Sequence, residues 1–307
     1  MDNLLLSEQT PNKMRYSRFL EPRELLSRAL SDEVFVALRE AVKSGLGAIS
    51  LLEGNRVQLN YGTTRLAVLR FKNNESQLVF FRPKESKIIP SLSDLAALAK
   101  EVKPSYMVEG KWQDQLCRCG FLDVPSTSRR WLVIDREAVI GFPSATEKKA
   151  FWSSVRSDLE GHTEAFRQLH LNWCHFKVPG DECDLLALSD KCELACWEVK
   201  DGSNGALEWA PFQAWAYRKA FEKAAPYISN GIKEMVRQKV ALGLLKEEVC
   251  DFLPEGDFRT IDAAVVVGNP KASRQKTDRL NESWKGVVPS VRVLEVVKSS
   301  NQLAELF

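Results

Sequence analysis

The stretch ELACWEVKDG, from Glu193 to Gly202, decides the fold, because it is an apolar run of strand character that ends with a carboxylate and an amine. Side chains alternate along a strand, so Glu198 and Lys200 are expected to point to the same face. An acid and a base on a largely apolar face are costly unless they pair or hold something. The stretch therefore predicts a buried strand that ends in a polar site.

The composition is that of a soluble protein of one or two domains. The chain has 307 residues, 44% of them hydrophobic, and its formal net charge of +2 neither favours nor excludes nucleic acid as a partner. No apolar run reaches the roughly 18 residues of a membrane span, and the first residues lack a secretory pattern. The seven cysteines are typical of reduced thiols. We expect a cytoplasmic protein without membrane contact.

The pattern divides the chain into two regions near Pro143. Residues 1–145 contain a helical pattern, then short alternating runs joined by turn sequences, which are typical of an antiparallel meander. We expect an N-terminal α+β domain that selects nucleic acid or binds a protein partner. Residues 146–307 are expected to form a second, α/β domain with a mixed sheet flanked by helices.

The second region has the order helix, three strands, helix, strand, with additions. The three strands are expected at residues 173–178, 181–189 and 192–200, after a helix from about residue 146 to 171. Two amphipathic helices follow, the first beginning near Pro211. Two further strands are expected after these helices, at residues 260–268 and 291–297.

Asp184 lies on the second of these strands, fourteen residues before Glu198. If the chain turns near Asp190, the two carboxylates become neighbours across the ladder, within about one rung. Carboxylates that close repel each other unless a cation lies between them. Mg²⁺ takes one or two carboxylates, completed by waters and phosphate oxygens. The residues therefore predict equipment for metal-assisted phosphodiester hydrolysis, in which Lys200 stabilises charge or holds water.

Asp184 followed by Glu198-Val199-Lys200 resembles the PD-(D/E)xK nuclease superfamily, which has a restriction-endonuclease-like fold. Its core order is also helix, three strands, helix, strand. Gln213 and Tyr217, four residues apart on the next helix, resemble the RecB-like branch. The resemblance covers about residues 146–297. Cys183 stands where the family name would have proline.

The resemblance implies a set of site residues. Asp184, Glu198 and the Val199 carbonyl would bind the metal, with Asp184, Glu198 and Lys200 as catalytic residues. Glu164 on the preceding helix is the choice to complete the metal shell, and Glu160 and His162 remain open alternatives. Residues expected to contact the substrate are Gln213, Tyr217, Lys271 and Arg274, the last two in a basic run that could equally be a solvated face.

The expected function is a Mg²⁺-dependent nuclease, with Mn²⁺ as an alternative, that acts on DNA in bacterial antiviral defence or DNA processing. The place in such a system is an analogy and is not inferred from the residues. Two alternatives stay open: a non-catalytic nucleic-acid-binding or scaffold subunit with the same fold, and a nuclease that cuts RNA. The sequence also leaves open endonuclease against exonuclease action, sequence specificity and assembly into a homo-oligomer.

Overall fold

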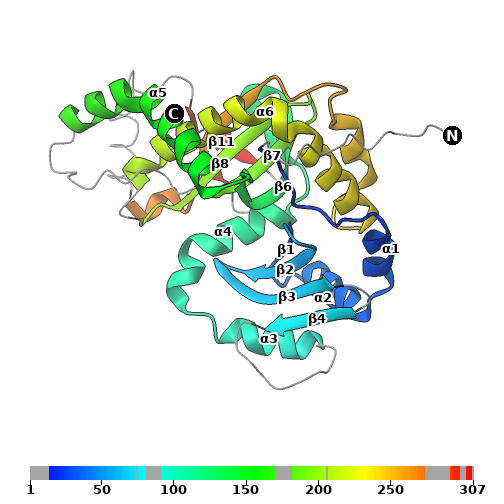
Figure 1. The fold of residues 1–307 in the computed structure, drawn as a ribbon. Coiled ribbons are helices and arrows are strands. Elements are labelled where there is room, and N and C mark those ends of the chain that lie inside the picture. The colour runs from blue at the N-terminus through cyan, green and yellow to red at the C-terminus, as the bar shows by residue number, and fades with distance from the viewer. Residues whose placement is uncertain are drawn as a thin grey trace.

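The computed structural model of the chain contains two β-sheets with helices packed against them, so the protein is mixed α/β (Figure 1). It describes residues 14–72, 75–80, 91–169, 182–204, 207–273, 291–297 and 302–305, without the side chains of residues 92, 161–169 and 272–273. None of the helices in these ranges has the length and apolar character that a membrane crossing needs. The smaller sheet lies below the larger one in Figure 1, with helix α4 between them.

The smaller sheet is an antiparallel meander with the order β1-β2-β3-β4. Gly54 and Asn55 have positive φ values of 75° and 57°, which lets the chain reverse tightly between the first two strands. Three helices cover one face of the sheet around a buried apolar core. The elements are α1 (Glu24–Ser31), α2 (Glu33–Lys43), β1 (Ala48–Leu52), β2 (Arg56–Tyr61), β3 (Thr64–Lys72), β4 (Glu75–Phe80) and α3 (Leu92–Lys100).

The larger sheet has seven strands in the order β11-β10-β9-β8-β7-β6-β5. β5 to β8 form an antiparallel meander, and β8, β9 and β10 run parallel, so helix α6 carries the chain back between β8 and β9. Helices α5 and α6 pack on one face, and α4 packs on the other. The elements are α4 (Met107–Arg118), β5 (Leu122–Val124), β6 (Arg129–Val139), α5 (Ala145–Leu169), β7 (Glu182–Ser189), β8 (Leu194–Asp201), α6 (Ala210–Ala241), β9 (Ile261–Gly268), β10 (Val291–Val296) and β11 (Leu303–Glu305).

The two edge strands of the larger sheet approach each other. An isolated parallel bridge joins Asp123 on β5 to Gln302 next to β11, so the sheet is nearly closed into a barrel. Near closure leaves little of either edge strand available for pairing with another chain. It also fixes the curvature of the central strands β7, β8 and β9, which carry the predicted site.

The predicted boundary near residue 145 does not separate the two sheets. β6 pairs with β7 from Trp131 opposite Ser189 to Val139 opposite Glu182, so β5 and β6 belong to the larger sheet. Helix α4 packs on this sheet. Strand pairing is a tertiary property that periodicity does not reveal. The strand expected at residues 173–178 lies outside the described residues. The two helices expected after β8 form one helix, α6, which contains Pro226.

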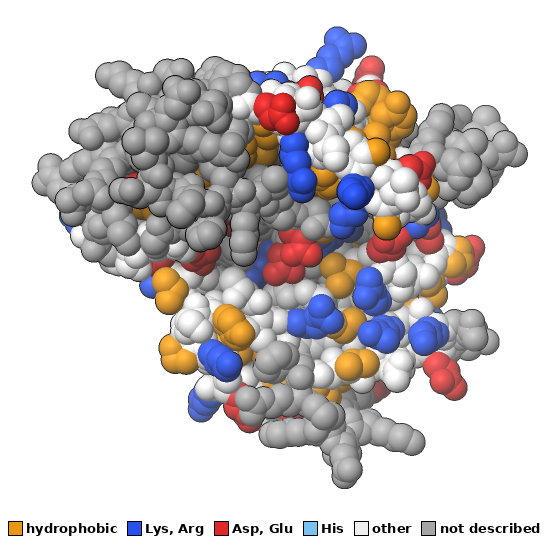
Figure 2. Space-filling model, turned by 60° about the vertical axis from the view of Figure 1, so that its left-hand side comes forward, with side chains coloured by type: hydrophobic (Ala, Val, Ile, Leu, Met, Phe, Trp, Pro, Cys, Tyr) orange, Lys and Arg blue, Asp and Glu red, His pale blue; other side chains and the backbone are white. Residues whose placement is uncertain are grey.

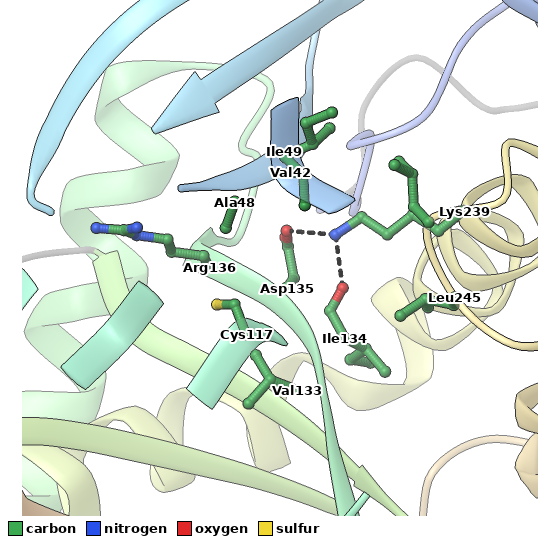
Figure 3. A pocket seen from close by; sticks show the side chains of 11 residues that line it. Val42, Ala48, Ile49, Cys117, Val133, Ile134, Asp135, Arg136, Lys239 and Leu245 are labelled. Carbon is green, nitrogen blue, oxygen red and sulfur yellow. Dashed lines mark hydrogen bonds and ion pairs between the residues drawn. The ribbon is translucent and has the colours of Figure 1, made fainter. Parts of the chain in front are cut away.

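Asp135 on β6 holds the two sheets together through a buried ion cluster beside a cavity of about 50 Å³ (Figure 3). Lys239 from α6 donates to its carboxylate at 3.1 Å and to the Ile134 carbonyl at 2.6 Å. Arg18 contacts the same carboxylate at 2.9 Å, and Tyr16 donates to it. Arg18 also donates to the Leu51 carbonyl of β1. Charges buried in this way stabilise the arrangement only while each keeps its partners.

A second buried ion pair fixes α4 against the turn between β2 and β3. Arg136 on β6 contacts Asp114 of α4 at 2.5 Å, and the second oxygen of Asp114 accepts the Gly62 N–H at 2.6 Å. Arg136 also donates to the Gly62 carbonyl and to Gln113. Gly110 lies on the helix face that meets this turn, where a Cβ would overlap the Gly62 backbone. The position of α4 is therefore set by both sheets.

Candidate active site

Glu198 and Lys200 lie near the C-terminal end of β8 and point to the same face, as alternation predicts. The Lys200 ammonium donates to Glu198 Oε1 at 2.7 Å, and the two residues are only 2% and 7% exposed. The other Glu198 oxygen, Oε2, is buried and has no hydrogen-bond partner within the described chain. A buried carboxylate oxygen without a partner is costly, because burial removes the water that would otherwise bind it.

Asp184 is brought next to this pair, as the predicted register requires. The ladder between β7 and β8 is paired as far as Leu185 opposite Trp197. Beyond this rung the Asp184 carboxylate accepts the Val199 N–H at 2.9 Å, so a side chain occupies a place that a backbone carbonyl would take in a continued ladder. The bond holds the half-buried Asp184 carboxylate beside Glu198. The role of the Val199 carbonyl as a metal ligand stays a prediction.

Glu109 from α4 completes the cluster, and sequence reasoning missed it. Its carboxylate lies 3.5 Å from the Lys200 ammonium and accepts a hydrogen bond from Asn204 in the loop after β8. The region before residue 145 was expected to select nucleic acid or bind a protein partner, so a contact with Lys200 from this region was not anticipated. The signal that could have found it was the helix at residues 107–118, if β6, β7 and β8 are taken as the three strands in the order helix, three strands, helix, strand.

The opposite face of β8 positions Glu109 by fixing its helix. Asp201 accepts a hydrogen bond from the Trp112 indole of α4 at 2.9 Å and lies 3.6 Å from the Lys111 ammonium. Against the effect of burial, hydrogen bonds from Ser203 and Trp112 hold the pKa of the Asp201 carboxyl below its usual range. The ring of Trp112 also lies against Gly268 of β9, where any Cβ would overlap it.

The carboxylates surround a lysine that stays protonated. Although burial lowers it, the charges of Glu198, Asp184 and Glu109 together raise the pKa of Lys200 above its usual range. Burial first, and then the Asp184 charge, raise the pKa of Glu198 to about 8, while Lys200 acts in the opposite direction. Burial likewise raises the pKa of Glu109, opposed by Lys200. Three acids therefore share one ammonium, which leaves the site short of positive charge.

The two residues of α6 that were predicted to contact the substrate differ in burial. Tyr217 is buried, with its ring 6.5 Å from that of Trp152 in a T-shaped contact. Burial, followed by the Glu198 charge, raises the pKa of the Tyr217 hydroxyl above its usual range. Gln213 is half-buried one helical turn earlier. No hydrogen bond within the described chain joins either residue to Lys200, so a contact with the lysine or the substrate stays a prediction.

The remaining predicted residues cannot be placed in the cluster. The side chains of Glu164 and His162 on α5 lie outside the described residues, and so does Arg274. Glu160 is exposed on α5, the helix inserted between β6 and β7. Lys271 is exposed in the short helical turn after β9, and its neighbour Pro270 packs on Gly202, two residues beyond Lys200.

Comparison with known proteins gives no relative. No family model, no curated protein and no solved structure matches the chain. Among the residues whose side chains are described, no three His, Cys, Asp or Glu residues lie close enough together to hold a metal ion by themselves. The function therefore has to be inferred from the geometry and charge of the cluster formed by Glu109, Asp184, Glu198 and Lys200, called the acid–lysine cluster below.

Proposed function

We propose that the protein is a metal-dependent nuclease of the restriction-endonuclease-like fold, with DNA as the expected substrate, that uses the acid–lysine cluster. The observation that carries the proposal is the buried Glu198, which shares its Oε1 with Lys200 while its Oε2 lacks a partner in the described chain, beside the Asp184 carboxylate. The element order α4, β6, β7, β8, α6, β9 also supports it, because it is helix, three strands, helix, strand. In this order α5 is an insertion.

A divalent cation fits the residues present. Glu198 Oε2 has no hydrogen-bond partner among the described residues, so it is free to bind a cation, and Asp184 adds a second carboxylate beside it. Mg²⁺ typically uses one or two carboxylates in such sites and takes its other ligands from water and phosphate, so a third protein acid is not required. When bound, the cation would neutralise phosphate charge and lower the pKa of a water ligand. The binding residues would be Asp184 and Glu198, with the Val199 carbonyl a further proposed ligand.

Lys200 stabilises negative charge in this proposal and does not remove a proton from water. Its raised pKa keeps it protonated at neutral pH, so it can only donate hydrogen bonds and offer positive charge. Glu198 and Glu109 hold its ammonium from two sides, at 2.7 Å and 3.5 Å. A charge fixed in advance stabilises the transition state of phosphoryl transfer without reorganising during the reaction.

The alternative is a subunit that binds nucleic acid without cutting it. It is favoured by the absence of a three-acid metal cluster among the described side chains. In that case the acid–lysine cluster would be a structural ion network, in which Lys200 is balanced by its acids alone. The buried, unpartnered Glu198 Oε2 argues against this, because a purely structural pair would be expected to satisfy both oxygens.

The experiment is a cleavage assay with plasmid DNA, linear duplex, single-stranded DNA and RNA, each with Mg²⁺, Mn²⁺ or EDTA. We expect cleavage of at least one substrate with either metal and none with EDTA, and we expect the Lys200→Ala protein to be inactive. Nuclease contamination is controlled by purifying this variant in the same way. Equal cleavage by both proteins, or cleavage in EDTA, would contradict the proposal. Binding without cleavage would favour the alternative.

A further inference from the structure

The smaller sheet has one face that α1, α2 and α3 do not cover. Ser50, Gln58, Asn60 and Val68 on this face are buried, so only part of it is accessible. Alternate residues of β1 to β4 point into the core formed with α1, α2 and α3, and the others point away from it. A β-bulge between Leu59 and Asn60 moves Arg65 onto the second set, opposite Asn60. This outward set contains four basic residues, called the basic face below: Arg56, Arg65, Arg70 and Lys72.

The basic face is arranged by strand register. Arg56 on β2 stands directly opposite Arg70 on β3, and Arg70 stands opposite Gln77 on β4. Like charges directly opposite each other on one face are destabilising. A neighbouring row is polar and buried, with Gln58 donating to Asn60 at 2.6 Å. The smaller sheet therefore carries a repulsive pair of arginines that packing alone does not explain.

No carboxylate of the described chain neutralises these four residues. No ion pair within 4.0 Å joins any of them to another described residue, although Lys72 stands opposite Glu75 in the ladder. Within the described chain Arg56 donates to the Glu53 backbone carbonyl, and the Glu53 carboxylate binds Arg15. Arg70 Nε is buried and has no hydrogen-bond partner among the described residues. The face therefore presents unbalanced positive charge with unused donors, which is complementary to a chain of phosphates.

The basic face and the acid–lysine cluster meet at the same helix end. The turn between β2 and β3, next to Arg65, donates from Thr63 N–H to the Tyr106 carbonyl at 3.1 Å, just before α4. The first turn of α4 carries Glu109, which contacts Lys200. Figure 2 shows Lys and Arg side chains spread over the lower half of the face drawn, at the level of the smaller sheet in Figure 1.

We propose that the basic face binds the phosphodiester backbone of the nucleic acid strand whose cleavage the acid–lysine cluster carries out. The inference rests on the proposed function for its substrate, and it adds a second binding surface contributed by the smaller sheet. A strand that leaves the Lys200 site passes the N-terminal turn of α4, where Tyr106 and Val108 are exposed, and reaches Arg65. DNA and RNA present the same phosphate groups to the basic face, so the test compares binding of DNA and RNA probes.

The test measures binding of labelled single-stranded DNA, duplex DNA and single-stranded RNA by fluorescence anisotropy in EDTA, over a range of salt concentrations. The principal variant is Arg65→Gln with Lys72→Gln, since both side chains are exposed and neither supports the core. The second is Arg56→Gln with Arg70→Gln, checked for folding by thermal unfolding. The matched control is Lys43→Gln with Lys100→Gln, two exposed lysines on the helices that cover the opposite face.

Each basic-face variant should weaken binding of the preferred nucleic acid by about ten-fold and reduce the slope of log K against log salt by about 1.4–1.8, for two lost phosphate contacts. The control should change neither. Wild-type affinity and slope in both basic-face variants would overturn the inference and leave the nuclease proposal standing. Weakened binding without cleavage by the wild type would support the basic face and reject the nuclease. No binding of any of the three probes would overturn the inference, while the cleavage assay with Mg²⁺ or Mn²⁺ decides the nuclease proposal.

Discussion

The two sheets treat their charged residues in opposite ways. In the larger sheet, charged side chains such as Asp135, Glu198 and Lys200 are buried, and each contacts a residue of opposite charge. In the smaller sheet, arginines on neighbouring strands face each other without any carboxylate partner in the described chain. A buried charge has to be compensated by its own protein, whereas a charge left half-exposed can be compensated by a ligand. The difference separates a preorganised site from a binding surface.

The largest loss of stability is expected at Asp135, the buried carboxylate that neutralises two buried cations of the larger sheet. Asp135→Ala leaves Lys239 and Arg18 buried without their shared carboxylate, so the free energy of unfolding should fall by about 3–5 kcal/mol. Urea unfolding measures it. The control is Glu53→Ala, which removes the exposed partner of Arg15 and should cost at most about 1 kcal/mol. Similar losses for both variants would show that burial does not distinguish the two kinds of charge.

Lys200→Ala tests whether Lys200 stabilises the transition state of cleavage or contributes to metal binding. The change removes the only ammonium contact that the described chain gives Glu198, so cleavage should fall by at least about 100-fold. Metal affinity should be kept or increased, because a neighbouring cation is lost. Cleavage rates on the best substrate and a Mn²⁺ titration of the same preparation test this. A wild-type rate would make Lys200 a structural partner of Glu198 and would remove the support for its catalytic role.

Glu109→Gln tests whether the helix between the sheets contributes to the site. The amide keeps the shape but loses the charge that holds the Lys200 ammonium from the side of α4, so cleavage should fall by about ten-fold, with little change in substrate binding. Rates at saturating substrate, together with the anisotropy assay, provide the measurement. The control is Glu33→Gln, an exposed acid in the first turn of α2. Unchanged cleavage in Glu109→Gln would confine the site to the larger sheet.

The metal-free protein should lose stability as the pH rises, because burial raises the pKa of Glu198 to about 8. Between the ordinary carboxyl pKa and this value, the folded state binds more protons than the unfolded state, so the free energy of unfolding falls with pH. The slope from one such group is at most about 1.4 kcal/mol per pH unit. Glu198→Gln should remove the decline, as followed by urea unfolding in EDTA from pH 5.5 to 8.5. Parallel curves for both proteins would contradict the raised pKa.

The central strands of the site could be predicted from sequence because alternation and turn position are local properties. Alternation placed Glu198 and Lys200 on one face, and the turn near Asp190 set the register that brings Asp184 beside them. Glu109 could not be found in this way, since its approach depends on the pairing of β6 with β7 and on α4 lying across β8. The basic face was also beyond reach, because a single bulge decides where Arg65 points.

A calorimetric titration of Mn²⁺ into the wild type, Glu198→Ala and Lys200→Ala tests the metal site most directly. The wild type should bind one or two ions. Glu198→Ala should lose most of this affinity and Lys200→Ala should keep it, because Glu198 is a proposed metal ligand and Lys200 is not. Thermal unfolding without metal checks that each variant is folded. Equal Mn²⁺ binding by all three proteins, or no binding by the wild type, would show that Asp184 of β7 and Glu198 of β8 do not form a metal site.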